Sequence, residues 1–497
     1  MAETLNPDGT PIYLGDIALS TPGLTGEAEL YLPGVPGMRG PQETAQQFAD
    51  ALAATEFSEQ FTVEITGPRQ LNTNGGTRAG GGGDNIAIQV PGPGTGFAQV
   101  LLYTAEDGTQ TWHLPDNIPA EAAAVRTRGG DSRTYHIPRA VMPAADGAPR
   151  TRGLVFAVGK KVLKVLVFPL VEKGVEFVAA KVAERWEATH RPYRLRTFTP
   201  GDYTAADGRE LGDSDWAALG SGRALLFVHG TFSRAHTGFG RLPRAVITEL
   251  HERYGGRVFA FDHPTLASSP TDNARWLAKA LPSGLRIDAD VITHSRGGLV
   301  AREICEYADQ LGLSGRLNVQ RLVMVAAPNA GTALAAVSHW KTFIDRVTNL
   351  LQFVPDNPVT DTMDAVLTVL KHVVLGAVSG LDGLMSMDPG GSYLRTRLNP
   401  PTALPHGRYF AVASDYRPPP GSPLLQVARD GLTDLVFGLE QNDLIVPTDG
   451  VFAVPGAHGF PIPAPLVFAP AAGVEHTSYM AQEPFTSQLL GWLAPSA

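Results

Sequence analysis

The sequence has very little cysteine and no excess of positive charge. Its 497 residues include one cysteine, Cys305, and 40 Lys and Arg residues against 49 Asp and Glu, which gives a formal net charge of -9. A single cysteine excludes an intramolecular disulfide and a metal site built from cysteines, and it fits a reducing compartment. Nucleic-acid binding needs clustered Lys and Arg to neutralise phosphates, so we expect no nucleic-acid partner.

Long hydrophobic segments are missing as well. The first nine residues contain neither a basic stretch nor an apolar run, so we expect no secretory signal and a cytoplasmic location. The most apolar segment, 153–180, carries several lysines and glutamates and has Pro169 in its middle. Those charges argue against a membrane-spanning helix.

The length of the chain and its changing composition predict several domains, roughly two to four. Residues 1–150 are rich in Gly and Pro, and their short runs of alternating apolar and polar residues are typical of half-buried strands. They predict a small β-rich accessory domain with one helix near 42–55. The glycine tract 75–84 lacks the Gly-Lys-Ser/Thr ending of a phosphate loop, which favours a flexible loop. The expected strands cover 28–32, 61–65, 85–90 and 99–103.

Residues 151–221 are expected to form a helical connector. Between 153 and 187, apolar residues recur near helical spacing with lysines among them, and Pro169 should kink the run. Two interpretations stay open. The segment is either a helix pair packed on a neighbouring domain or a helix in peripheral contact with a membrane or lipid surface, where Lys beside Val and Phe is favourable.

From residue 222 onward, short and nearly continuous apolar runs alternate with amphipathic helical stretches. Strands of this kind, separated by helices, are typical of a parallel sheet that is covered on both faces. Residues 222–497 therefore predict an α/β domain. Its expected strands cover 224–228, 258–261, 289–292, 322–326, 409–412 and 466–468.

Ser295 is the expected nucleophile. It lies in the run Thr293-His294-Ser295-Arg296-Gly297, between the expected strand 289–292 and an amphipathic helix. Strand, tight turn and helix form the context of a nucleophile elbow, whose strained turn requires small neighbours. Gly297 and Gly298 supply them on the helix side, whereas Thr293 stands in place of the usual first glycine. The helix N-terminus favours negative charge that develops beside the serine.

Acyl transfer also needs two backbone N–H donors that point at the oxyanion. One should come from the residue after the nucleophile, Arg296, and the other from the loop after an earlier strand. His229-Gly230-Thr231 follows the expected strand 224–228 directly. We therefore expect the amides of Thr231 and Arg296 to form the oxyanion hole, and the amide of Phe232 is the next candidate donor.

A serine hydroxyl is a weak nucleophile without a base and an acid that orients the base. Both are expected after the serine in the chain. His476 follows the last expected strand and is favoured as the base over His458, which precedes that strand. Asp443 is favoured as the acid, with Asp449 and Asp415 as alternatives. A buried carboxylate would hold the imidazole in the required tautomer.

These motifs, together with the run Ala327-Pro328-Asn329-Ala330-Gly331-Thr332 and the segment 383–394, resemble the α/β-hydrolase lipases. The similarity is to bacterial triacylglycerol lipases and to the deacylases of lipid-linked inositol anchors, and it covers about residues 222–495. It implies an α/β-hydrolase domain with a helical cap inserted at about 333–395. It also implies hydrolysis of a small-molecule or lipid ester by a Ser–His–Asp triad, without a metal or organic cofactor.

Alternatives stay open for the inserted segment and for the reaction. A mobile apolar cap can shield a site and accept an apolar chain, whereas a static helical pair would only widen the core. The same triad would also serve a thioesterase, an amidase or an acyltransferase. A catalytically inactive scaffold that binds a partner is a further alternative, and the sequence does not indicate an oligomeric state.

Overall fold

The structure is a computed structural model. It describes residues 2–33, 51–52, 54–71, 85–106, 108–116, 132–138, 160–169, 179–351, 360–374, 380–401, 408–418, 436–437, 440–457 and 459–494. The chain forms two compact units. The first consists of Met1–Glu176, Ile344–Ala377 and Pro420–Val427, and the second of Phe177–Phe343, Val378–Pro419 and Ala428–Ala497.

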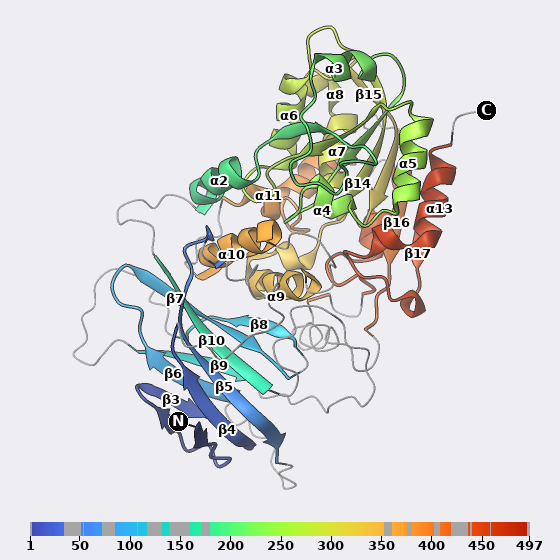
Figure 1. The fold of residues 1–497 in the computed structure, drawn as a ribbon. Coiled ribbons are helices and arrows are strands. Elements are labelled where there is room, and N and C mark those ends of the chain that lie inside the picture. The colour runs from blue at the N-terminus through green and yellow to red at the C-terminus, as the bar shows by residue number, and fades with distance from the viewer. Residues whose placement is uncertain are drawn as a thin grey trace. The chain divides into compact units, whose positions relative to one another are not determined.

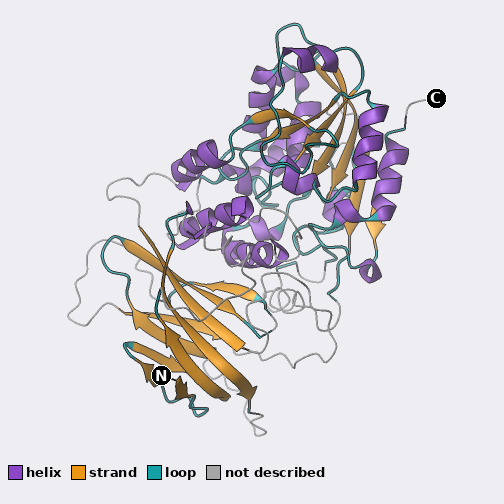
Figure 2. Cartoon of the chain, viewed as in Figure 1, coloured by secondary structure: helices purple, strands orange, loops and turns teal. Residues whose placement is uncertain are grey.

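The first unit is built mainly from antiparallel strands (Figure 2). A six-stranded sheet has the order β1-β4-β5-β10-β7-β8, and a four-stranded sheet has the order β2-β3-β6-β9. Apolar side chains from both sheets form one buried core, so the sheets pack face to face. The strands are β1 (Ala2–Thr4), β2 (Ile12–Leu14), β3 (Ile17–Ser20), β4 (Leu24–Tyr31), β5 (Ser58–Gln70), β6 (Asn85–Pro91), β7 (Phe97–Thr104), β8 (Gln110–His113), β9 (Ser132–Pro138) and β10 (Lys160–Pro169).

The four strands expected in this unit are confirmed by β4, β5, β6 and β7. The expected helix at 42–55 lies largely outside the described residues, where only 51, 52 and 54 are seen to be helical. The glycine tract 75–84 lies wholly outside them. The prediction of a β-rich N-terminal region is thus confirmed by two sheets rather than by a few isolated strands.

The prediction of a helix through 153–187 is wrong for residues 160–169. This segment is β10, an inner strand between β5 and β7. Both faces of β10 are largely buried, so apolar residues follow one another without the alternation that would mark a strand. Its valines fit helical spacing, but β-branched side chains favour a strand. A lipid-surface helix is excluded for this segment. Among the described residues of the predicted segment, a helix is present from 179 on, as α2 (Ala179–His190).

Part of the segment between β15 and β16, residues Ile344–Ala377, belongs to the first unit, which the sequence did not predict. The segment contains α9 (Trp340–Leu351) and α10 (Thr360–Val374). Side chains of α9 bind the free edge of β8, because Asp345 Oδ1 accepts the Trp112 N–H at 2.7 Å and Asn349 Oδ1 accepts the Gln110 N–H at 2.9 Å. An open strand edge carries unpaired N–H and C=O groups. Side chains of α9 therefore satisfy backbone N–H groups at the β8 edge of the six-stranded sheet in the first unit.

The second unit contains a seven-stranded, mostly parallel sheet with the order β11-β13-β12-β14-β15-β16-β17. Only β11 runs antiparallel to its neighbour. The sequence predicted every strand of this sheet except the four-residue β11. The strands are β11 (Arg194–Thr197), β12 (Ala224–Val228), β13 (Val258–Asp262), β14 (Ile287–His294), β15 (Leu317–Val325), β16 (Arg408–Ser414) and β17 (Leu466–Phe468).

Helices cover both faces of this sheet (Figure 1). Side chains of α4, α5 and α13 share one buried core with β12, β14, β15 and β16. Figure 1 shows α6, α7 and α8 on the opposite side. The helices of the unit are α2, α3 (Asp213–Leu219), α4 (Ala235–Phe239), α5 (Arg244–Arg253), α6 (Pro270–Ala280), α7 (Gly297–Glu306), α8 (Ala308–Leu311), α11 (Asp382–Met385) and α13 (Glu483–Trp492).

The register of the parallel strands brings distant loops together. Val228 at the end of β12 pairs with Phe261 of β13 and with Thr293 of β14, and His294 pairs with Val325. The loops that follow these strands therefore begin side by side at the carboxyl edge of the sheet, where ligands bind in open α/β sheets.

None of the helices in the described part of the chain has the length and apolar character needed to cross a membrane.

Candidate active site

Ser295 has a strained backbone. It follows β14 directly, and its φ of 53° lies in the left-handed region, which is uncommon for a residue other than glycine. Its N–H donates to Val325 O at 2.8 Å, and its carbonyl accepts the Gly298 N–H at 2.9 Å. Strain of this kind, held by surrounding structure, is concentrated at functional sites.

The chain packs around Ser295 too closely for side chains at three positions. A Cβ atom on Gly297 would lie 2.3 Å from Val228 O, and one on Gly298 would lie 2.4 Å from Ala327 Cβ. A Cβ atom on Gly230 would lie 2.6 Å from Ser295 Cβ. The glycines that sequence analysis singled out thus let α7 and the 229–232 loop approach the serine. Thr293, in the position of the missing glycine, is buried and donates from its hydroxyl to Val323 O at 3.2 Å.

Unpaired amides lie in the two loops expected to bind an oxyanion. Within the described residues, the main-chain N–H groups of Thr231, Phe232 and Arg296 have no hydrogen-bond partner in the protein. Arg296 is the N-cap residue of α7, so the positive end of the helix dipole also lies here. Buried N–H groups are normally paired. Free amides at this edge of the sheet can therefore receive a developing negative charge.

His229 holds the loop that carries Thr231. It is completely buried, and burial lowers its pKa to about 3, so the ring is neutral. Its Nδ1–H donates to Gly230 O at 2.9 Å, while Nε2 accepts the His263 N–H at 3.1 Å. The rings of His229 and His263 stack with centroids 4.2 Å apart. This packing fixes the conformation of the Gly230 peptide and hence the direction of the next amide.

His476 and Asp443 form a buried hydrogen-bonded pair, with His476 Nδ1 2.8 Å from Asp443 Oδ2. Asp443 Oδ1 accepts the N–H groups of Ile445 and Val446 at 3.0 and 2.8 Å. Burial on its own would raise the pKa of Asp443, but the charge and hydrogen bond of His476 and the two amides together lower it. The carboxylate is thus ionised, and it selects the His476 tautomer that has its proton on Nδ1.

The other acids and the other histidine have different surroundings. Asp449 is exposed, and Asp415 lies 3.9 Å from Arg417; among the described residues, neither has a hydrogen bond to His476. His458 lies outside the described residues. Of the three candidate acids, Asp443 is the one that the structure brings to His476.

His294 connects the serine turn to the loop of His476. Its Nε2–H donates to the carbonyl oxygen of His476 at 2.9 Å, and the centroids of the two rings are 5.0 Å apart. Burial, followed by the nearby His476, lowers the pKa of His294 to about 3, so it donates as a neutral ring. Within the described residues Ser295 Oγ has no hydrogen bond to His476. Such bonds are often long in a free enzyme and tighten with substrate.

Two residues that the sequence did not single out, Tyr479 and Glu475, support this pair. Tyr479 donates its hydroxyl to Asp443 Oδ2 at 2.9 Å, and the carboxylate of Glu475 accepts the Thr477 N–H at 2.6 Å. The spacing of Tyr479 three residues after His476 was visible, but nothing in the sequence showed that Asp443 would lie beside both. In the described residues, no group of three or more His, Cys, Asp or Glu side chains could hold a metal ion.

Comparisons with known proteins give a family of undefined function and several distant structural likenesses. The family profile described as "Domain of unknown function (DUF7379)" matches residues 190–494. No curated protein sequence matches the chain. The chain is similar in structure to Bacillus licheniformis lipase BlEst2 in its mature form (18% identity, 54% of this chain, 90% of that chain, TM-score 0.30). It is also similar to lipase 1 from Pelosinus fermentans (12% identity, 55% of this chain, 99% of that chain, TM-score 0.34) and to the metagenomic carboxyl esterase MGS0156 (18% identity, 54% of this chain, 74% of that chain, TM-score 0.29).

Proposed function

The chain belongs to the DUF7379 family, whose description assigns no activity, and we propose that it is an α/β-hydrolase that cleaves carboxylic esters with Ser295 as its nucleophile. The observation that carries the proposal is the strained, positive-φ serine at a strand-to-helix turn, followed by a residue whose amide is unpaired. This geometry is the one that presents a nucleophile beside donors for an oxyanion. The buried His476–Asp443 pair supplies the matching base.

In the proposed reaction, Ser295 Oγ attacks the ester carbonyl carbon while its proton moves to His476 Nε2. The carbonyl oxygen becomes an oxyanion that accepts hydrogen bonds from the amides of Thr231 and Arg296. The carbon–oxygen bond to the alcohol then breaks, and His476 Nε2 returns the proton to the leaving alkoxide. Water repeats the sequence on the acyl-enzyme and releases the carboxylic acid.

The role of Asp443 in this reaction follows from its position. Because Asp443 accepts from Nδ1, the lone pair of neutral His476 is on Nε2, which is the atom that must take the serine proton. The ionised Asp443 also stabilises the imidazolium that forms after the transfer. The residues proposed for the triad are Ser295, His476 and Asp443.

Covalent labelling tests the proposal directly. A fluorescent fluorophosphonate should label the folded wild-type protein and leave Ser295→Ala unlabelled, since phosphonylation requires an activated serine. Ser283→Ala is a matched control, because Ser283 is exposed and has no proposed part in the site. An unlabelled wild-type protein would overturn the proposal in favour of an inactive scaffold.

Substrate panels separate the proposed activity from the other acyl-transfer reactions. We expect p-nitrophenyl esters to be hydrolysed faster than the corresponding anilides and acyl thioesters. A series from acetate to palmitate then distinguishes an esterase from a lipase by the chain length at which kcat/KM is highest. A clear preference for thioesters or amides would show that the nucleophile is correct and the ester assignment is not.

A further inference from the structure

Two charged residues near the end of α2 are buried, although the proposed reaction does not use them. Glu187 and Arg191 lie four residues apart and are 0% and 2% exposed. Glu184 and Arg185, on the same helix, are exposed. Burying a carboxylate or a guanidinium is unfavourable unless each finds good partners, and apolar side chains would fill the same space more easily. Their partners therefore indicate what they do.

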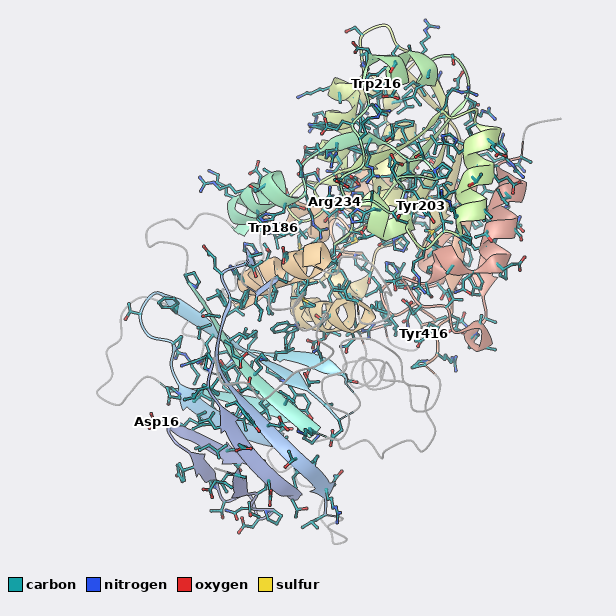
Figure 3. All side chains as sticks on the ribbon, viewed as in Figure 1. Asp16, Trp186, Tyr203, Trp216, Arg234 and Tyr416 are labelled. Carbon is teal, nitrogen blue, oxygen red and sulfur yellow. The ribbon has the colours of Figure 1, made fainter. Side chains whose placement is uncertain are left out.

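Arg191 contacts the loop that carries Thr231. Its Nη1 donates to Ser233 O at 3.1 Å, and its guanidinium lies over the ring of Trp186, 5.6 Å from the centroid. Trp186 is labelled on this helix in Figure 3. The Ser233 hydroxyl in turn donates to Gly230 O at 3.0 Å. Arg191 thus hydrogen-bonds the Ser233 end of the loop 229–233, while His229 hydrogen-bonds its Gly230 end.

Glu187 contacts the loop after β13. Its carboxylate accepts three successive backbone N–H groups, from Thr265, Leu266 at 2.8 Å and Ala267 at 3.0 Å. Burial raises the pKa of Glu187, while the three amides and the charge of Arg191 act in the opposite direction. A side chain that binds three consecutive amides fixes the path of that loop.

The loop held by Glu187 is fastened to Arg296. The Arg296 guanidinium donates to Ser268 O and, through Nε at 2.7 Å, to Gly383 O. The Gly383 N–H donates to Leu266 O at 2.9 Å. Arg296, Gly383 and the loop after β13 therefore form one hydrogen-bonded network. Arg296 is completely buried, and its position therefore depends on these carbonyl oxygens. Its main-chain amide is the second donor proposed for the oxyanion.

We propose that Glu187 and Arg191 are positioning residues that hold the two oxyanion amides, Arg191 acting on the Thr231 loop and Glu187 acting on Arg296. This inference rests on the proposed serine hydrolase function. Donors for an oxyanion lower the reaction barrier only when they are held within a few tenths of an ångström of the required place. One short segment, from 187 to 191, therefore contributes to the positions of both amides.

The test measures kcat per active site in Arg191→Met and Glu187→Gln, with Arg185→Met and Glu184→Gln as matched controls on the exposed face of α2. Active sites are counted by titration with a fluorophosphonate. We expect Arg191→Met to lower kcat about tenfold with little change in KM, below the roughly 10²–10³-fold loss for deleting a donor itself. Glu187→Gln should lose less, because the amide oxygen can still accept two of the three N–H groups. Both controls should match the wild type.

The dependence on substrate distinguishes positioning from other roles. The oxyanion donors contact only the reacting carbonyl, so p-nitrophenyl acetate and p-nitrophenyl butyrate should lose kcat by the same factor. Arg191→Lys, which keeps the charge, is the second variant if Arg191→Met does not fold, and it should recover part of the loss where both fold. Equal kcat per titrated site in the wild type and the variants, with only a lower melting temperature, would overturn the positioning role. An inactive, unlabelled wild-type protein would instead overturn the proposed function.

Discussion

The hydrogen bonds of Asp443 determine what an Asp443→Asn substitution will do. Oδ1 accepts two backbone N–H groups, from Ile445 and Val446, and Oδ2 accepts from His476 Nδ1. An asparagine must keep its carbonyl oxygen toward the two backbone donors, because its NH₂ group cannot accept a hydrogen bond. The NH₂ group therefore faces His476 Nδ1, which must become the acceptor.

The consequence is the wrong tautomer of His476. With the lone pair on Nδ1, the ring proton is on Nε2, and Nε2 cannot remove the proton of Ser295. In serine hydrolases a change of this kind lowers kcat by about 10⁴, which corresponds to about 5.4 kcal/mol of transition-state stabilisation. Tyr479 can still hydrogen-bond residue 443 by accepting from the NH₂ group, so the fold should persist.

The assay compares kcat for p-nitrophenyl butyrate among wild type, Asp443→Asn and the exposed control Asp449→Asn. Circular dichroism establishes that each variant is folded. We expect Asp449→Asn to match the wild type. An Asp443→Asn variant that retains more than one tenth of the wild-type kcat would refute the tautomer argument and the assignment of Asp443 as the orienting acid.

Two further predictions concern stability. Gly297→Ala would place a methyl group 2.3 Å from Val228 O, an overlap with main chain that no rotamer relieves, and should lower the free energy of unfolding by about 1–3 kcal/mol or more. Gly491 in α13 has open space around it, so Gly491→Ala should raise the free energy of unfolding by about 0.5–1 kcal/mol. Equal urea midpoints for the two variants would contradict the close packing at Gly297. His229 and His294 have pKa values lowered to about 3, so the unfolded chain binds their protons first as the pH falls below about 6.5. Their contribution to stability, which is full above that pH, should therefore decline toward pH 3 by up to about 1.4 kcal/mol per pH unit for each histidine. In urea titrations at pH 7 and 4.5, the free energy of unfolding of His294→Gln should decline less than that of the wild type.

Much of the second unit could be predicted because its signals are local. A buried parallel strand is a short apolar run, so β12 through β17 were visible from the sequence alone. The same rule failed for β10, where two buried faces and regularly spaced valines suggested a helix. It also missed β11, which is only four residues long. The expected helix at 42–55 and the glycine tract 75–84 lie outside the described residues.

The assignment of the inserted segment required the structure. Its helical character was predicted, and α9 and α10 confirm it. That α9 would bind the edge of β8 could not be predicted, since Asp345 and Trp112 are 233 residues apart. Polar side chains on a helix give no indication of which backbone groups they will satisfy.

By itself the sequence determined the residue types and local contexts of the proposed chemistry. It placed Ser295 between a strand and a helix, and it put glycines where segments of the chain approach each other closely. It also placed a candidate acid and then a histidine after the serine. The tertiary structure alone decided that Asp443, rather than Asp449 or Asp415, meets His476, and that Glu187 and Arg191 reach the loops around Thr231 and Arg296. The physical reason is that periodicity and sterics act between neighbours in the chain, whereas hydrogen bonds between distant residues exist only once strand register and helix packing have brought them within about 3 Å.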